Sequence, residues 1–272
     1  MGPQAARETA HDEGVRRAAG VESSLVKPWE TVDRAAAPDG AELVLARRDG
    51  EWVVRVAGRT LMSSRVHGSE EALAAIVLRG LAAPRAVLVG GLGMGFTLRA
   101  ALDRLPPDAR VVVVELVPGL VAWNRGPLAE LAGRPLEDPR VRLQHGDVGA
   151  RIAEAKGAYD AILLDVDNGP SALAHAGNAA LYGDRGARAC AAALRAGGAL
   201  AVWSAGPDER YRLRLEAAGL AVAEEPVPAR SGGGGVRHVV VLGRKATARG
   251  PVTPRPRGAA ASSRAGGRSG RR

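Results

Sequence analysis

The chain has 272 residues, of which 46% are hydrophobic, and its formal net charge at pH 7 is +9. This size and composition predict a folded domain with a substantial core, and no apolar run reaches the roughly 20 residues that cross a bilayer. The first residues also lack the apolar stretch of a signal peptide, so we expect a cytoplasmic protein without a membrane partner. The single cysteine, Cys190, excludes an internal disulfide and a multi-cysteine zinc site.

The positive charge is concentrated at the end of the chain. Residues 244–272 contain nine basic side chains and no acidic one, which accounts for the whole net charge. Because this segment is also rich in Gly, Pro, Ser and Ala, we predict that 244–272 is a basic, disordered tail. A solvated tail and a weak electrostatic contact with nucleic acid or another anionic surface both fit this composition, and no other nucleic-acid contact is expected.

The first part of the chain is predicted to contain a leader and a small β-subdomain. Residues 1–38 are interpreted as a flexible leader, because proline and glycine interrupt the pattern near its end. Residues 39–66 are predicted to form a small N-terminal β-subdomain built around a hairpin. Its strands are expected at Glu42–Ala46, Trp52–Ala57 and Arg59–Ser64.

From residue 67 to 243, short apolar strands alternate with helical patterns. This alternation predicts a Rossmann-like α/β domain, in which helices cover both faces of a mostly parallel sheet. The last two strands are expected to form an antiparallel pair at the edge of the sheet. The predicted strands are Ala86–Val89, Arg110–Glu115, Val141–Leu143, Ala161–Leu164, Gly198–Ser204, Leu220–Ala223 and Val236–Gly243, and the predicted helices are Ser69–Leu81, Phe96–Leu105, Val121–Leu131, Gly149–Ala155, Asp184–Leu194 and Asp208–Ala217.

Three predicted strand ends carry groups that could hold a nucleotide, because ligands of open parallel sheets bind at the carboxyl ends of the strands. The first is a glycine loop that lets the backbone approach a ligand closely. The second is Glu115, about 20 residues later, which could accept hydrogen bonds from both ribose hydroxyls. The third is Asp147, which could receive the amino group of adenine or form a turn with its own backbone. The loop residues are Gly90, Gly91, Gly93, Met94 and Gly95. This arrangement fits an S-adenosylmethionine-type nucleotide and also NAD.

Several stretches occur together in an informative order. They are Val87–Val89 with the glycine loop and Thr97–Arg99, Val114–Leu116, Asp138–Val141 with Gly146 and Asp147, Tyr159–Asp165, and Leu194–Gly198. In this order they resemble the spermidine synthase family, aminopropyltransferases with a class I S-adenosylmethionine-methyltransferase-like fold. The resemblance runs from about residue 42 to residue 243. It implies a transferase of polyamine biosynthesis, with Glu115 at the ribose and Asp165 as the catalytic carboxylate.

The sequence departs from the family at three places. The family's glycine loop carries an Asp, which disfavours intact S-adenosylmethionine by like-charge repulsion, where this sequence has Met94. We therefore predict that S-adenosylmethionine binds at least as well as its decarboxylated form. A Tyr-His-Glu run of the family's amine site corresponds here to Ser69-Glu70-Glu71, and a second Asp of the family corresponds to Asn168. The nucleotide pocket is thus expected to be kept and the acceptor pocket to be rebuilt.

Asp165 and Asp167 are the predicted catalytic residues. An amine acceptor arrives protonated, since its pKa is near 10, and a carboxylate beside it can take the proton and stabilise the cation that forms. A cap in the following loop is the alternative role for Asp165. Weaker candidates are Tyr182 beside the acceptor and Trp123 and Asn124 near the adenine. The histidines His67, His145, His175 and His238 lack metal-ligand spacing, so no metal is predicted and solvated or core roles are expected for them.

Three interpretations of the function remain open. The first is aminopropyl transfer from decarboxylated S-adenosylmethionine to a small amine. The second is a methyltransferase that uses S-adenosylmethionine on a small molecule, which Met94 favours. The third is a nucleotide-binding protein without catalysis, and an NAD oxidoreductase is a more distant fourth because no group dedicated to hydride transfer is found. The sequence determines neither the acceptor nor whether the chain forms a homodimer.

Overall fold

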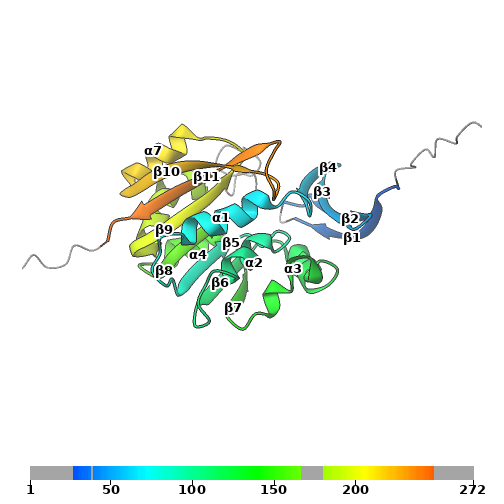
Figure 1. Ribbon diagram of the computed structural model, residues 1–272, viewed down its shortest axis with the longest axis horizontal. Helices are drawn as coiled ribbons and strands as arrows, with labels where there is room; N and C mark the ends of the chain where they lie inside the picture. Colours follow the sequence, from blue (N-terminus) through cyan, green and yellow to red (C-terminus); the bar gives the residue numbers. More distant parts are fainter. Residues whose placement is uncertain (1–26, 38, 167–179, 248–272) are drawn as a thin grey trace, which may run out of the picture.

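The computed structural model describes residues 27–37, 39–166 and 180–247. Within these ranges the strands form two sheets, a four-stranded antiparallel sheet near the amino terminus and a larger seven-stranded sheet (Figure 1). Helices cover both faces of the larger sheet. The predicted α/β fold, with a mostly parallel sheet and a small N-terminal β-subdomain, is therefore confirmed.

The N-terminal sheet has one strand more than the sequence predicted. Its strands are β1 (Glu30–Ala36), β2 (Glu42–Arg48), β3 (Glu51–Val56) and β4 (Arg59–Ser63), and they follow one another in this order across the sheet. The prediction that residues 1–38 form a leader is wrong for β1. This strand is largely exposed and has no apolar alternation, so its pairing with β2 and its contacts with α3, rather than its own pattern, hold it in place.

The seven strands of the larger sheet lie in the order β10-β11-β9-β8-β5-β6-β7. The pairs among β5 to β9 are parallel, whereas β11 is antiparallel to β9 and β10 is antiparallel to β11, as predicted for the edge pair. The bounds are β5 (Ala86–Gly90), β6 (Arg110–Glu115), β7 (Val141–His145), β8 (Tyr159–Leu164), β9 (Leu194–Ser204), β10 (Leu220–Pro228) and β11 (Arg237–Lys245).

The boundary of the predicted tail needs a small correction. β11 continues to Lys245, whose ammonium group donates to the carbonyl oxygens of Ala191 at 2.6 Å and Leu194 at 2.7 Å. Residues 244 and 245 are part of the sheet because they pair with Ala221 and Leu220 of β10. The residues from 248 onward lie outside the described part of the chain.

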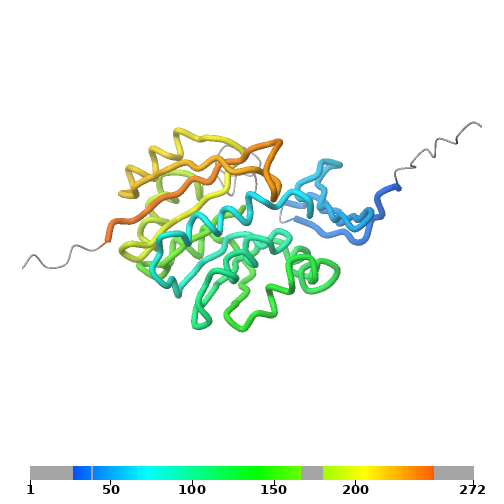
Figure 2. Tube along the Cα trace, viewed as in Figure 1, coloured from blue at the N-terminus to red at the C-terminus, as the bar shows by residue number. Residues whose placement is uncertain are grey.

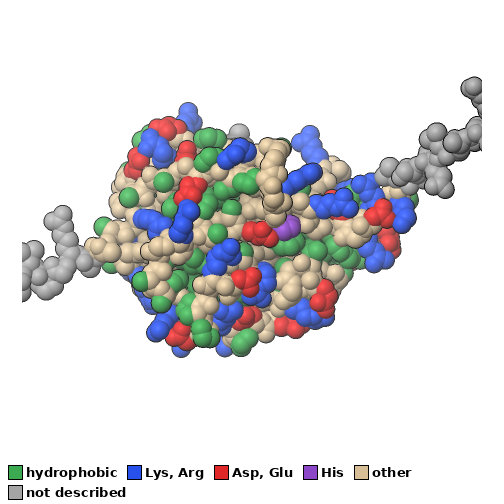
Figure 3. All heavy atoms as spheres, viewed as in Figure 1, with side chains coloured by type: hydrophobic (Ala, Val, Ile, Leu, Met, Phe, Trp, Pro, Cys, Tyr) green, Lys and Arg blue, Asp and Glu red, His purple; other side chains and the backbone are tan. Residues whose placement is uncertain are grey.

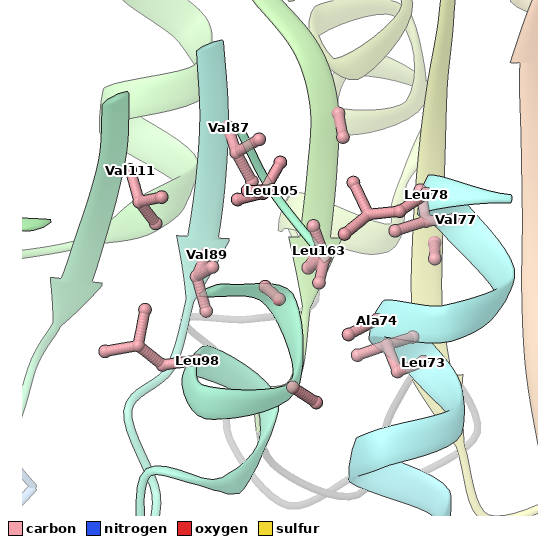
Figure 4. Packing of buried hydrophobic residues seen from close by; sticks show 14 of the residues in the cluster. Leu73, Ala74, Val77, Leu78, Val87, Val89, Leu98, Leu105, Val111 and Leu163 are labelled. Atoms are coloured by element: carbon pink, nitrogen blue, oxygen red, sulfur yellow. The ribbon is translucent and has the colours of Figure 1, made fainter. Parts of the chain in front are cut away.

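Two hydrophobic layers hold the helices against the larger sheet. α1 (Gly68–Leu78) and α2 (Phe96–Leu102) cover one face, and α4 (Val148–Glu154), α6 (Asp184–Ala193) and α7 (Glu209–Ala217) cover the other. Figure 4 shows part of the first layer, in which Leu163 of β8 lies between Val89 of β5 and Leu73 of α1. Each such side chain stabilises the fold by about 1.5–3 kcal/mol on burial. In the described part of the chain, no helix has the length and apolar character needed to span a membrane.

A third hydrophobic cluster joins the two sheets. Leu43, Leu45 and Val54 of the N-terminal sheet pack against residues of the glycine loop, α2 and α3 (Pro118–Arg125). The tube in Figure 2 shows the N-terminal sheet beside α3 at one end of the larger domain. The predicted helix Val121–Leu131 is wrong in extent: α3 ends at Arg125 because Gly126 adopts a non-helical backbone, and the short helices η1 (Ala129–Ala132) and η2 (Pro135–Glu137) follow.

Candidate active site

A cavity of about 840 Å³ lies at the carboxyl ends of the parallel strands. Its walls come from the ends of β5, β6, β7, β8 and β9, the start of β11, the first turn of α1 and the N-terminal sheet. The strand order reverses between β5 and β8, which is where ligands bind in open α/β sheets. The volume lies within the roughly 300–1,000 Å³ that small-molecule sites occupy.

The glycine loop forms the floor of this cavity and requires glycine for steric reasons. Gly91 has φ +86°, and a Cβ there would lie 2.2 Å from the backbone oxygen of Asp165. Gly93 is fixed by the side chain of Asn124, which donates to its carbonyl oxygen at 2.8 Å. Both glycines line the cavity. The loop thus brings the ends of β5 and β8 into contact, which only a residue without a side chain permits.

Met94 lies away from the cavity, in contrast to the expectation that it faces the nucleotide. Its side chain is 2% exposed and belongs to the cluster that joins the two sheets. Gly90 and Gly95 do not line the cavity either: a Cβ on Gly90 would lie 2.8 Å from the side chain of Val148, and Gly95 has φ +90° at the start of α2. These three positions therefore help to form the loop without lining the cavity.

Glu115 lies at the end of β6 with its carboxylate held by backbone amides. Oε2 accepts from the amide of Leu92 at 2.7 Å and Oε1 from that of Val117 at 2.8 Å. Burial raises the pKa of this carboxyl, and the backbone hydrogen bonds act in the opposite direction. Glu115 also lines the cavity, so its carboxylate can meet a ligand there.

Asp147 makes the local backbone hydrogen bond that was one of its two predicted roles. It caps α4, with Oδ1 accepting from the amide of Gly149 at 2.7 Å, and it also lines the cavity. The cap fixes the position of the carboxylate beside the end of β7.

Asp165 and Glu70 bring two further carboxyl groups to the cavity. Asp165 follows β8 directly, and its Oδ2 accepts from the Thr97 hydroxyl at 2.6 Å. Burial raises the pKa of Asp165, and the charge of Glu115 adds to the effect. Glu70, in the first turn of α1, makes no hydrogen bond within the described residues; burial raises its pKa well above the ordinary value, and the charges of Asp165 and Glu71 act in the same direction. The two cavity carboxyls are therefore close enough to repel each other when both are ionised.

Acidic side chains dominate the charge of the cavity. Five carboxyl side chains line it, and no lysine or arginine occurs among its described lining residues. Such a site attracts cations and repels phosphates, because charge interactions are strong where water is partly excluded. It therefore suits a sulfonium or ammonium ligand and disfavours the pyrophosphate of NAD. The acidic residues are Asp39, Glu70, Glu115, Asp147 and Asp165.

The sequence analysis missed a polar cluster on the opposite side of the cavity. Ser69 is 2% exposed; its Oγ accepts from Nε1 of Trp203 at 3.0 Å and lies 2.9 Å from Nδ1 of His238. All three residues line the cavity. The antiparallel direction of the last strand was the available signal, because it places His238, at the start of β11, at the edge where the parallel strands end.

The other candidates have structural surroundings or cannot be placed. Nε1 of Trp123 donates to Asp33 at 2.7 Å in the cluster between the sheets, and the Tyr182 hydroxyl donates to the carbonyl of Val166 at 3.1 Å. Burial raises the pKa of the Cys190 thiol to about 12, which agrees with a core residue. Asp167, Asn168 and His175 lie outside the described residues. Within the described ranges, no group of three or more His, Cys, Asp or Glu side chains is arranged to hold a metal ion.

Comparison with known proteins relates this site to one family. No family model matches the sequence. A polyamine aminopropyltransferase of Nitrosomonas europaea is 35% identical over 129 residues, and one of Korarchaeum cryptofilum is 33% identical over 96 residues. These matches cover 47% and 35% of this chain but only 37% and 29% of the relatives, so the chain matches less than half the length of each.

Solved structures support the same relation at the level of the fold. The chain resembles a spermidine synthase in complex with the transition-state analogue AdoDATO and the spermidine synthase from Thermotoga maritima, each with a TM-score of 0.64 at 17% identity. Each likeness covers 79% of this chain and 72% of the other. The resemblance predicted from the sequence is thus confirmed: the chain has the fold of the spermidine synthases and is similar, over part of its length, to polyamine aminopropyltransferases.

Proposed function

We propose that this chain transfers an aminopropyl group from decarboxylated S-adenosylmethionine to a small amine, as a transferase of polyamine biosynthesis. The observation that carries this proposal is the cavity with five carboxyl groups and no lysine or arginine among its described lining residues. Both substrates are cations, since the donor bears a sulfonium and an ammonium group and the acceptor is an ammonium ion at neutral pH. The names of the two sequence relatives agree with this substrate class.

The order of the strands divides the cavity between the two substrates. Gly91, Glu115 and Asp147, at the ends of β5, β6 and β7, form the side on which the nucleoside of the donor would bind. The ends of β8 and β9 and the start of β11 form the other side, which leaves the acceptor there. Asp165 lies between the two sides, at the point where the strand order reverses.

The residues of the cavity then have distinct tasks. Glu115, held in place by backbone amides, would accept hydrogen bonds from the ribose hydroxyls. Asp165, oriented by Thr97, would hold the acceptor nitrogen in line with the donor and stabilise the cation that forms. Because the donor is already activated, alignment of two bound substrates supplies much of the rate. Asp167 stays part of the proposal as a second carboxylate for the acceptor.

Methyl transfer from intact S-adenosylmethionine is the second candidate. It is favoured by the glycine loop, which contributes no acidic side chain to the cavity because position 94 is a methionine buried behind the loop. A loop without a carboxylate does not repel the carboxylate of the intact nucleotide. The remaining carboxyl groups favour the decarboxylated donor, whose net charge is more positive by one.

Incubation of the purified chain with either nucleotide and a set of linear diamines tests the proposal. We expect mass spectrometry to detect an aminopropylated amine with the decarboxylated donor. Asp165→Asn should lower kcat at least about 100-fold, because the acceptor loses its orientation and the cation that forms loses its stabilising charge, while Asp184→Asn, an exposed residue of α6, should leave kcat unchanged. A methylated product formed only with the intact nucleotide would establish the second candidate, and tight nucleotide binding without any product would identify a binding protein.

The proposal also includes the expected partner, the cellular location and the oligomeric state. The partner is a small-molecule amine, and a cytoplasmic location is part of the proposal that cell fractionation can test. Size-exclusion chromatography with light scattering would determine whether the chain forms a homodimer.

A further inference from the structure

The acceptor side of the cavity contains a histidine held by two neighbours. Nδ1 of His238 lies 2.9 Å from Oγ of Ser69, and the same oxygen accepts from Nε1 of Trp203 at 3.0 Å. The rings of Trp203 and His238 pack edge to face, with centroids 4.6 Å apart and an interplanar angle of 65°. Three elements, α1, β9 and β11, thus fix one imidazole ring at the wall of the cavity.

The hydrogen bonds leave one ring nitrogen for a ligand. Nδ1 is engaged by Ser69, whereas Nε2 of His238 has no hydrogen-bond partner among the described residues. The Trp203 N–H can only donate, so it occupies one acceptor position of the Ser69 oxygen and leaves a second one. That oxygen can therefore also accept from Nδ1–H, and in this tautomer Nε2 is an acceptor. An ammonium ligand, which can only donate, selects this tautomer.

We propose that Nε2 of His238 binds the acceptor amine and takes up the proton that the amine must lose, with Ser69 and Trp203 as positioning residues. This inference rests on the proposed alkyl transfer to an amine and names a catalytic residue for it. The position of His238 on the acceptor side, past Asp165 in the strand order, brings it to the amine rather than to the nucleoside.

The proposed step balances in protons and electrons. The acceptor R–NH₃⁺ gives one proton to Nε2, which yields an imidazolium and a free amine. The lone pair of that amine forms a bond to the carbon attached to the sulfonium, and the electron pair of the broken carbon–sulfur bond stays on the sulfur as a neutral thioether. The product is a secondary ammonium ion, and the imidazolium later returns its proton to the solvent.

The surroundings of the ring suit this role. Burial lowers the pKa of His238, so the ring is neutral and ready to accept a proton near pH 7. Glu70 of α1 and Asp165 after β8 are carboxyl groups that line the same cavity. The lining contributes no lysine or arginine within the described residues that would oppose the imidazolium.

His238→Asn is the decisive variant. The asparagine amide can take the place of Nδ1 toward Ser69 but offers no basic atom where Nε2 lies, so the fold should remain intact. We expect kcat with the decarboxylated donor and 1,4-diaminobutane to fall about 100-fold at pH 7, within the range of general-base catalysis. The matched control is His145→Asn, a histidine at the end of β7 that does not line the cavity, and its kcat should stay unchanged.

The dependence of kcat on pH separates a proton acceptor from a packing residue. In the wild type, kcat should fall as the pH drops through the pKa of His238, which lies below the ordinary 6.5. His238→Asn should lack this descending limb, and Ser69→Ala should keep the limb but move its midpoint. A binding readout without turnover is the imidazole Cε1–H resonance of His238, which can be assigned among five histidines and should shift when 1,4-diaminobutane is added.

The outcomes distinguish this inference from the function on which it rests. If the wild type transfers the aminopropyl group and His238→Asn retains both its kcat and its pH profile, the assignment of His238 is overturned. If the wild type forms no product with any amine and the resonance of His238 does not respond to the diamine, the proposed function fails first. A loss of kcat in both His238→Asn and His145→Asn would also overturn the assignment, because a general perturbation would then explain the result.

Discussion

At the scale of single residues, the cavity shows how burial and hydrogen bonding set the state of each carboxyl group. Glu115 is 5% exposed and accepts two backbone hydrogen bonds, whereas Glu70 makes none among the described residues. Hydrogen bonds to the charged form compensate part of the lost hydration of Glu115, whereas Glu70 has no such hydrogen bond among the described residues. Glu115 is therefore suited to accept hydrogen bonds from a neutral hydroxyl ligand, whereas the ionised form of Glu70 would be stabilised by a cation.

Glu115→Ala should abolish nucleotide binding while the fold is retained. Each charge-assisted hydrogen bond to the ribose contributes roughly 1.5–3 kcal/mol, which is about tenfold or more in affinity. The melting temperature should also fall, since the amides of Leu92 and Val117 lose their acceptor. Calorimetric titration and circular dichroism measure the two effects. Glu137→Ala, on exposed η2, is the control, and an unchanged nucleotide affinity in Glu115→Ala would remove this residue from the site.

Glu70→Gln should stabilise the substrate-free protein and weaken its hold on the amine. A carboxyl whose pKa is raised by folding binds more protons in the folded state, so stability falls as the pH rises from the ordinary 4.5 toward the raised value. Glutamine is neutral throughout, and the variant should therefore lose this fall. Thermal unfolding between pH 4 and pH 8 compares it with the wild type and with Glu154→Gln, an exposed residue of α4. Parallel melting curves for wild type and Glu70→Gln would contradict the assignment.

At the scale of elements, the glycine loop links the site to the N-terminal sheet. One side of the loop, with Gly91 and Gly93, forms the cavity floor, and the other side, with Met94, packs against Leu43 and Leu45. Residues of the N-terminal sheet also line the cavity, among them Thr60 and Met62. The small subdomain is thus a wall of the site, and its packing determines the shape of the loop that the nucleotide would contact.

Met94→Asp should destabilise the protein rather than change its choice of donor. At a side chain that is 2% exposed, a carboxylate would lose its water without gaining a partner, at a cost of more than about 3 kcal/mol. Met94→Leu, which nearly conserves the volume, should cost less than about 1.5 kcal/mol and serves as the control. Urea unfolding measures both. A stable Met94→Asp variant that rejects intact S-adenosylmethionine would show instead that position 94 faces the nucleotide, as the sequence suggested.

At the scale of the whole molecule, the excess charge is separated from the folded domain. On the face shown in Figure 3, basic and acidic side chains are interspersed. Five acidic residues of the described domain line the cavity, where they would act on a ligand, and the basic residues beyond 247 follow the last strand. The net charge of +9 therefore says little about the charge that a substrate meets.

Two truncations should show where the domain ends. Removal of residues 248–272 should leave the melting temperature and the nucleotide affinity unchanged, as the composition of this segment predicts. Truncation after Gly243 also removes Lys245 and its hydrogen bonds to Ala191 and Leu194, together with the backbone pairing of residues 244 and 245. At about 1 kcal/mol per hydrogen bond, we expect a fall of several degrees in melting temperature. Differential scanning calorimetry measures the melting temperature of both truncated forms. A lower melting temperature after removal of residues 248–272 alone would show that this segment packs on the domain.

The sequence alone determined most of the elements and the presence of Gly91 and Glu115 at the carboxyl edge of the sheet. Strands such as Ala86–Gly90 and Tyr159–Leu164 are continuous apolar runs because helices cover both sides of them, and such runs are visible without any contact. Gly91 and Glu115 were predicted for the same reason: they directly follow such strands, and the ends of neighbouring parallel strands meet at one edge. A local sequence pattern is enough to predict a site residue when that residue directly follows a recognisable strand.

The tertiary structure decided which residues meet where α1, β9 and β11 line the cavity, and on which side of the glycine loop position 94 lies. Ser69 lies more than a hundred residues from Trp203 and His238 in the chain, and the three meet only when α1, β9 and β11 pack together. Met94 and Gly93 are neighbours in sequence, yet one packs behind the loop and the other faces the cavity. β1 is a strand only because β2 offers it hydrogen bonds. In each case the deciding interaction is non-local, and a non-local interaction leaves no periodic trace in the sequence around the residue that makes it.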